Sequence, residues 1–217
     1  DIIALGAVAG SGAQTINTGA GNDKITAAQA DIAVAVINGG AGTDTLVISD
    51  GTPTIADSTF TNISSIEKIS LSSATTLSWT VGGYANALAT ANGGVLDITA
   101  AALTGATTID GSGLGASNSL KLTLTNVDTG SASATAITLS QGADNITMTQ
   151  AGVGANDTIT ISGGTAALAS TAAKTIDLSA VTVAGAISVT TGAGADTIKA
   201  SGLVGTYAAG ALSLIHI

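Results

Sequence analysis

One short phrase returns along this chain, and it constrains the fold more than any other feature. A glycine-rich turn leads to an acidic residue and then to a β-strand-forming residue. The fullest copy is Gly39–Leu46, and Gly19–Ile25 and Gly192–Ile198 nearly repeat it. Looser copies are Gly142–Ile146, with Asp144, and Gly152–Ile159, with Asp157. Because glycine adopts positive φ without strain, each copy predicts a tight turn.

The spacing of these turns favours a stack of similar units. Ile16–Gly21 returns as Ile37–Gly42, and Asp157, Asp177 and Asp196 follow one another at a similar spacing. The period is about 20 positions, a size typical of solenoids, in which each winding of the chain, here called a rung, stacks on the last. A sandwich would also show short strands between polar turns, but it does not account for a constant spacing.

Short strands are expected between the turns. Leu120–Thr125 alternates apolar and polar residues, the period-2 pattern of a half-buried strand. Strands are predicted at 15–17, 32–38, 45–48, 66–71, 96–99, 107–110, 120–125, 136–139, 158–162, 175–178 and 187–189. We therefore predict an all-β fold, a parallel β-solenoid (β-helix or β-roll-like) with short irregular or helical insertions, its rungs stacked at about 4.8 Å.

The stretch from 50 to 94 departs from the pattern. It contains the only Pro, Phe, Trp and Glu of the chain, at Pro53, Phe60, Trp79 and Glu67. We predict an irregular section in which Phe60 and Trp79 form a local core, an interpretation preferred to an aromatic binding platform. A short helix is predicted at 84–91, and a weaker helix candidate spans 165–173.

Composition narrows the possible partners. The 217 residues include 29 Gly and only 2% aromatics, so small aliphatic side chains must build the core. The net charge is −9, there is no Arg, and five Lys are the only basic residues beside one His, which argues against nucleic-acid binding. No apolar run reaches the ~18 residues of a transmembrane helix. Cysteine is absent, and bound metal is one other source of stability.

The acidic residues of the turns are candidate calcium ligands. Asp carboxylates and backbone carbonyls are the hard oxygens that Ca²⁺ prefers, and stacked carboxylates repel one another unless a cation lies between them. The competing interpretation is an Asp that hydrogen-bonds its own turn. Ca²⁺ takes 6–8 oxygens, so no single turn is enough. The candidate ligands are Asp23, Asp44, Gly19, Gly21, Gly40, Gly42, Asp144, Asp157 and Asp196.

Gly39–Leu46 resembles the G-G-x-G-x-D-x-U phrase of the repeats-in-toxin (RTX) calcium-binding proteins. Gly19–Ile25 and Gly192–Ile198 match all but the first Gly, and Phe60–Leu71 resembles a phrase of bacterial S-layer and adhesin-type surface proteins. The resemblance implies a secreted, extracellular protein of the cell surface that binds Ca²⁺. It departs from the family in one respect: the copies stand singly, where RTX blocks repeat them in tandem.

The last six residues differ from the rest. Leu212–Ile217 lacks the Gly, Thr and Ala texture of the chain and matches one reading frame of a common sequencing adapter. We predict that 212–217 is a non-native tail and that 1–211 is a β-solenoid fragment of a larger protein. His216, the only His, is therefore given no role.

These observations predict a calcium-stabilised structural segment of an S-layer or large adhesin. Its expected partners are neighbouring copies or the rest of the same surface protein, with a cell-surface glycan as a further candidate. The alternative is a solenoid face that binds glycan or ice through threonine-rich strands such as Leu122–Thr125 and Thr158–Ile161. A carbohydrate-active β-helix enzyme is the least favoured reading, and no enzymatic activity is predicted, because nothing marks a nucleophile or a general base.

Overall fold

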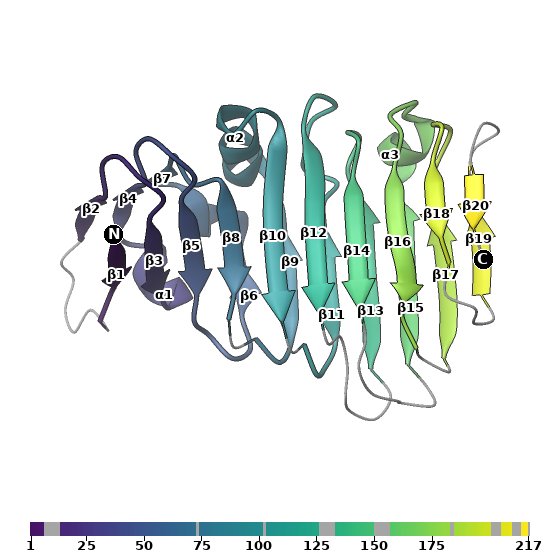
Figure 1. Ribbon diagram of the computed structural model, residues 1–217, viewed down its shortest axis with the longest axis horizontal. Helices are drawn as coiled ribbons and strands as arrows, with labels where there is room; N and C mark the ends of the chain where they lie inside the picture. Colours follow the sequence, from purple (N-terminus) through teal and green to yellow (C-terminus); the bar gives the residue numbers. More distant parts are fainter. Residues whose placement is uncertain are drawn as a thin grey trace.

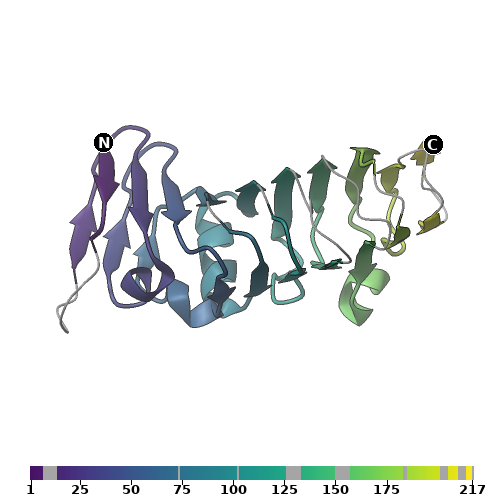
Figure 2. The same cartoon turned by 90° about the horizontal axis from the view of Figure 1, so that it is seen from below.

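The chain winds into an elongated stack of parallel strands, which confirms the predicted β-solenoid (Figure 1). The computed structural model describes residues 1–6, 14–72, 74–101, 103–125, 133–149, 157–182, 185–200, 205–209 and 214–216. The two ends of the chain lie at opposite ends of the stack (Figure 2). No helix among the described residues is long and apolar enough to cross a membrane.

Every paired strand of the described chain runs parallel to its neighbour, and the strands form three sheets. The ten-stranded sheet has the order β1 (Ile2–Ala4), β3 (Lys24–Ala27), β5 (Thr45–Ile48), β8 (Lys68–Leu71), β10 (Val95–Ala101), β12 (Ser119–Thr125), β14 (Asn145–Thr149), β16 (Thr175–Ala180), β18 (Thr197–Lys199), β20 (Leu214–His216). The seven-stranded sheet has the order β19 (Gly205–Ala208), β17 (Ala186–Thr190), β15 (Thr158–Gly163), β13 (Ala134–Leu139), β11 (Thr107–Asp110), β9 (Leu77–Thr80), β6 (Thr54–Ile55). The third sheet comprises β2 (Thr15–Asn17), β4 (Val36–Asn38) and β7 (Ile63–Ser64).

Four short helices interrupt the winding of the described chain: α1 (Gln29–Ile32), the 3₁₀-helix η1 (Asp57–Phe60), α2 (Gly83–Ala91) and α3 (Thr165–Ala169). The helix predicted at 84–91 is confirmed, and the weaker candidate ends earlier than expected because Ser170 is extended. The strand predicted over 32–38 is wrong in its first half. α1 ends there at Ile32, and its Gln29 N–H donates to Asp50 of the next rung at 2.6 Å. Residues 33–34 form a turn, and β4 begins only at Val36.

The irregular section continues the solenoid. β6, β8 and β9 lie in the two large sheets, while η1 follows β6 and α2 lies between β9 and β10 along the chain. α2 lengthens its rung. Lys24 pairs with Thr45 of the next rung, whereas Lys68 pairs with Asp97, and more residues separate Lys68 from Asp97 than separate Lys24 from Thr45. α3 has the same effect between the paired residues Asn145 and Thr175.

Stacked aliphatic side chains build the core, as the composition predicts. Equivalent positions of the ten-stranded sheet hold side chains that are at most 2% exposed: Ile25, Leu46, Ile69, Ile98, Leu122, Ile146, Ile176 and Ile198. Burial of each such side chain contributes about 1.5–3 kcal/mol. Trp79 and Phe60 are also buried, with ring centroids 5.2 Å apart, which confirms their role as local core.

Candidate functional site: a column of turn residues between rungs

The register of the ten-stranded sheet stacks the predicted acidic residues. Ile2 pairs with Lys24, Lys24 with Thr45 and Thr45 with Lys68, so the residues immediately before them lie one above another. We call this line of positions the turn column. In chain order it contains Asp1, Asp23, Asp44, Glu67, Leu96, Leu120, Asp144, Lys174 and Asp196.

Carboxylates of the turn column accept hydrogen bonds from the backbone of the preceding rung. The Asp23 N–H donates to Asp44 Oδ1 at 2.8 Å, and the Asp44 N–H donates to Glu67 Oε2 at 2.6 Å. The amino group of Asp1 donates in the same way to Asp23 Oδ1. This contact is the main reason why the pKa of Asp23 lies below its usual value, whereas burial raises it. The nearby Thr18 hydroxyl donates to the Gly39 carbonyl oxygen at 2.6 Å and leaves Asp23 Oδ2 without a hydrogen bond.

The same contact recurs in later rungs. The Leu120 N–H donates to Asp144 Oδ1, and the Lys174 N–H donates to Asp196 Oδ1, each at 2.8 Å. On the seven-stranded sheet, the Ser133 N–H donates to Asp157 Oδ1 at 3.0 Å. A backbone N–H buried at a turn must find an acceptor. The Asp of the next rung supplies it, so these residues join rungs and do not only shape their own turns.

The second carboxylate oxygens of Asp23 and Asp44 have no hydrogen-bond partner among the described residues. Both Oδ2 atoms are buried, and Asp44 as a whole is 0% exposed. Neither Asp44 nor Glu67 has an ion pair within the described part of the chain. These rungs therefore hold three stacked carboxylates. Among the described residues, their one ion pair is that between the Asp1 amino group and Asp23.

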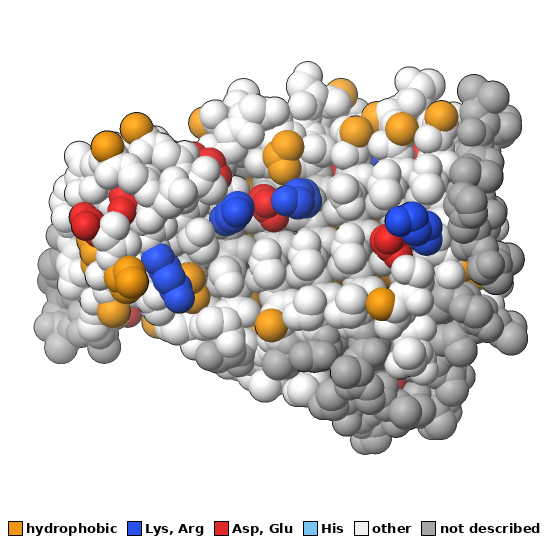
Figure 3. Space-filling model, viewed as in Figure 1, with side chains coloured by type: hydrophobic (Ala, Val, Ile, Leu, Met, Phe, Trp, Pro, Cys, Tyr) orange, Lys and Arg blue, Asp and Glu red, His pale blue; other side chains and the backbone are white. Residues whose placement is uncertain are grey.

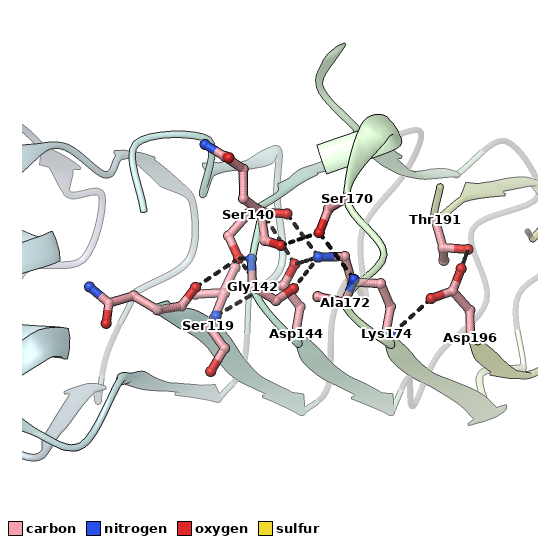
Figure 4. A network of polar contacts seen from close by, with 12 residues as sticks. Ser119, Ser140, Gly142, Asp144, Ser170, Ala172, Lys174, Thr191 and Asp196 are labelled. Carbon is pink, nitrogen blue, oxygen red and sulfur yellow. Dashed lines mark hydrogen bonds and ion pairs between the residues drawn. The ribbon is translucent and has the colours of Figure 1, made fainter. Parts of the chain in front are cut away.

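The Asp144 turn has its charge balanced by a buried lysine (Figure 4). Lys174 Nζ lies 3.3 Å from Asp144 Oδ2 and donates to the carbonyl oxygens of Ser140, at 2.9 Å, and of Gly142. Asp144 also accepts from the N–H of Ser140 at 2.9 Å and from its hydroxyl. Both charged side chains are 0% exposed.

The turn at Asp196 is closed by a hydroxyl. Thr191 Oγ1 donates to Asp196 Oδ2 at 2.5 Å (Figure 4). In the Asp44 turn the residue at the equivalent place is Gly39, which has no hydroxyl to offer. A Cβ on Gly39 would lie 2.6 Å from Asp44 Oδ2 and would overlap the Ser65 carbonyl oxygen, so only glycine fits there.

The predicted turn glycines have the expected backbone. Gly19, Gly21, Gly40 and Gly42 have φ of 91°, 127°, 92° and 142°, values open to glycine alone without strain. Successive turns touch, because a Cβ on Gly40 would overlap the Gly19 carbonyl oxygen. That oxygen already accepts from the Ala41 N–H at 2.8 Å, and the Gly21 N–H donates to the Ala41 carbonyl at 2.9 Å.

Among the charged members of the turn column that sequence reasoning missed are Glu67 and Lys174. Glu67 follows no glycine-rich phrase, and only the register places it above Asp44. A signal for Lys174 does exist: Lys174-Thr175-Ile176 repeats the pattern of Asp196-Thr197-Ile198 with the charge reversed.

The described residues contain no group of three or more His, Asp or Glu side chains that could hold a metal ion. A cation at one of these turns would therefore draw on backbone carbonyl oxygens as well as carboxylates. None of the family models, curated proteins or solved structures compared with the chain matches it.

Proposed function

We propose that the chain is a structural segment of a secreted bacterial surface protein, of the S-layer or large-adhesin type, and that Ca²⁺ stabilises it. The observation that carries this proposal is the pair of buried, unpartnered Oδ2 atoms on Asp23 and Asp44, in consecutive rungs. Each of these carboxylates has a hydrogen-bond partner at Oδ1 only. Burying a charged oxygen without a partner is costly, and a divalent cation beside the Oδ2 atoms would remove that cost.

Asp23 and Asp44 would hold the ion, together with carbonyl oxygens of Gly19, Gly21, Gly40 and Gly42. For the other turns, Asp157 and Asp196 stay predictions, whereas the Asp144 carboxylate already faces the Lys174 ammonium. Calcium would supply folding energy, because an ion that binds only the stacked turns favours the folded state. The chain's own contribution is a rigid rod of hydrogen-bonded rungs, suited to contact neighbouring copies or the rest of the same protein at the cell surface, and we propose no catalytic role.

The test is the melting temperature of the protein in chelator and in millimolar Ca²⁺. At a calcium concentration of 100 times Kd the ion adds about 2.7 kcal/mol. For a chain of this length that is a rise of roughly 5–11 °C, from about 2–4 °C per kcal/mol.

The variant Asp44→Asn should lose most of this rise. Asp110→Asn is the matched control, because Asp110 lies on an outer face and accepts from the Ser112 N–H of its own turn at 3.0 Å. If the wild-type protein gives identical melting curves in chelator and in Ca²⁺, the proposal is rejected.

A second candidate function has one specific observation in its favour, a hydroxyl array on the outer face of the seven-stranded sheet. The register aligns outward residues into two columns across its strands. One column holds Thr54, Ser78, Thr108, Ala136, Thr160, Ser188 and Thr206, and the other holds Thr80, Asp110, Thr138, Ser162, Thr190 and Ala208. None of these residues is buried.

The two large faces therefore differ in charge. The ten-stranded face carries Lys and Asp side chains among uncharged ones (Figure 3), including the ion pairs Lys121–Asp97 and Lys199–Asp177. The outward columns of the seven-stranded face contain Asp110 as their one charged residue. Hydroxyls repeat there at about 4.8 Å across strands and about 6.6 Å along them, an array suited to ordered water that Ala136, Asp110 and Ala208 interrupt.

We infer that ice is the better-supported ligand of this face, with a glycan as the alternative. The two outward columns hold no aromatic side chain on which a sugar ring would stack. Thr160→Lys should reduce inhibition of ice recrystallisation, whereas Thr123→Lys, on the opposite large sheet, should not. Absence of any effect of the wild-type protein on ice growth would reject this second role.

A further inference from the structure

Two turns of the same type handle their buried negative charge in opposite ways. The turns of the first rungs place Asp23, Asp44 and Glu67 in consecutive positions of the turn column. The later rungs place Asp144, Lys174 and Asp196 there. One series contains three carboxylates, and the other alternates two carboxylates with an ammonium.

The Lys174 ammonium has the surroundings of a bound cation. Its three oxygen neighbours are two turn carbonyls, from Ser140 and Gly142, and the Asp144 carboxylate (Figure 4). These are the oxygen types that a hard cation takes in a glycine-rich turn. The Lys174 N–H also donates to Asp196 Oδ1, so this one residue is bonded to both neighbouring rungs.

A metal ion could enter this turn only by displacing a fully buried ammonium from three oxygens. Asp144 has no unused oxygen either: Oδ1 accepts from the Leu120 N–H, and Oδ2 accepts from the Ser140 N–H and faces Lys174. Asp44 differs in both respects, since its Oδ2 is free and no side-chain cation of the described residues pairs with it.

We propose that Lys174 is a resident counter-cation that makes the Asp144 turn independent of metal, so that calcium acts at the first rungs and not at this turn. The inference rests on the proposed function, because it assigns that calcium to one part of the solenoid. The protein then has a calcium-responsive section around Asp23 and Asp44 and a section around Lys174 that is ordered without metal.

Hydrogen–deuterium exchange of the whole chain, with chelator and with millimolar Ca²⁺, tests this directly. Calcium should slow exchange at least tenfold in peptides from 18–48 and 63–72 and leave peptides from 140–149 and 174–182 unchanged. Equal slowing in both sections would overturn the inference and leave the proposed function standing. No slowing in either section would overturn both.

Two substitutions at the same position sharpen the test. Lys174→Ala removes the ammonium and leaves space, so exchange in 140–149 should rise in chelator and fall again when Ca²⁺ is added. Lys174→Met removes the charge but fills the space, so calcium should restore less protection. Lys199→Met is the control, because Lys199 is half exposed and pairs with Asp177 at the surface. A Lys174→Ala protein whose 140–149 segment ignores calcium would contradict the proposal, and the wild-type measurement decides the matter if the variant does not fold.

Discussion

Replacement of Asp44 by Ala tests whether the carboxylates of the turn column hold the rungs together. The substitution removes Asp44 Oδ1, the acceptor of the Asp23 N–H at 2.8 Å, at a position with 0% exposure. The freed N–H belongs to Asp23, which is only 3% exposed, so the loss should cost about 1–3 kcal/mol. At about 2–4 °C per kcal/mol, the melting temperature should fall by roughly 2–12 °C.

The measurement is made in chelator, so that metal binding does not contribute. Denaturant unfolding gives the free energy, and hydrogen exchange reports the Asp23 amide, which should exchange faster. Asp44→Asn keeps an oxygen acceptor and removes a buried charge, and it should therefore be more stable than Asp44→Ala. Asp110→Ala should change stability by no more than about 0.5 kcal/mol. The reasoning is refuted if Asp44→Ala matches the wild type in stability and leaves exchange at the Asp23 amide unchanged.

Three further predictions follow from single contacts. Gly39→Ala should destabilise the first rungs, because its Cβ would overlap the Ser65 carbonyl oxygen; a variant with wild-type denaturation would show that the turns can separate. Trp79→Ala should lower the free energy of unfolding, measured with denaturant, by about 3–5 kcal/mol, because Trp79 is 0% exposed. The fluorescence of Trp79, the only Trp of the chain, should resist quenching by acrylamide in the native wild type, and easy quenching would contradict its burial. The folded-state pKa of Asp177 lies below 3.8, chiefly through the Ser179 hydroxyl, so the stabilisation from this carboxylate is present above pH 3.8 and is lost as the pH falls through the folded value. Asp177→Asn should flatten the loss of stability below pH 3.8, and an unchanged acid profile would argue against this contribution.

The sequence predicted the strands best where alternation was clear. Residues 107–110 form β11 with the predicted bounds, and 120–125 lies within β12. The strand predicted from Ile32 failed because an acceptor from the next rung, Asp50, favours a helical turn there. The tail predicted as non-native contributes Leu214–His216 as β20, paired with β18, and 212, 213 and 217 lie outside the described residues.

The candidate site was predictable in its parts and not in its contacts. The glycine-rich phrases marked Asp23, Asp44, Asp144, Asp157 and Asp196, all of which are at most 3% exposed. They also predicted the positive φ of the turn glycines. Nothing in the phrase indicated that the carboxylate oxygens would reach back to the amides of the preceding rung. That contact depends on which turn of the preceding rung stacks against the phrase, and the phrase alone does not determine this.

The repeated turns, their spacing and the alternating strands were by themselves sufficient to determine a parallel solenoid, because each is a property of one rung and its local backbone. Only the tertiary structure decided the register, since α2 and α3 lengthen their rungs beyond the period of the first turns. That register places Lys174 above Asp144 and leaves Asp44 above Asp23. Whether a buried carboxylate meets an ammonium or another carboxylate is set by the stacking of whole rungs, whose summed strand pairing outweighs the charge of any one turn.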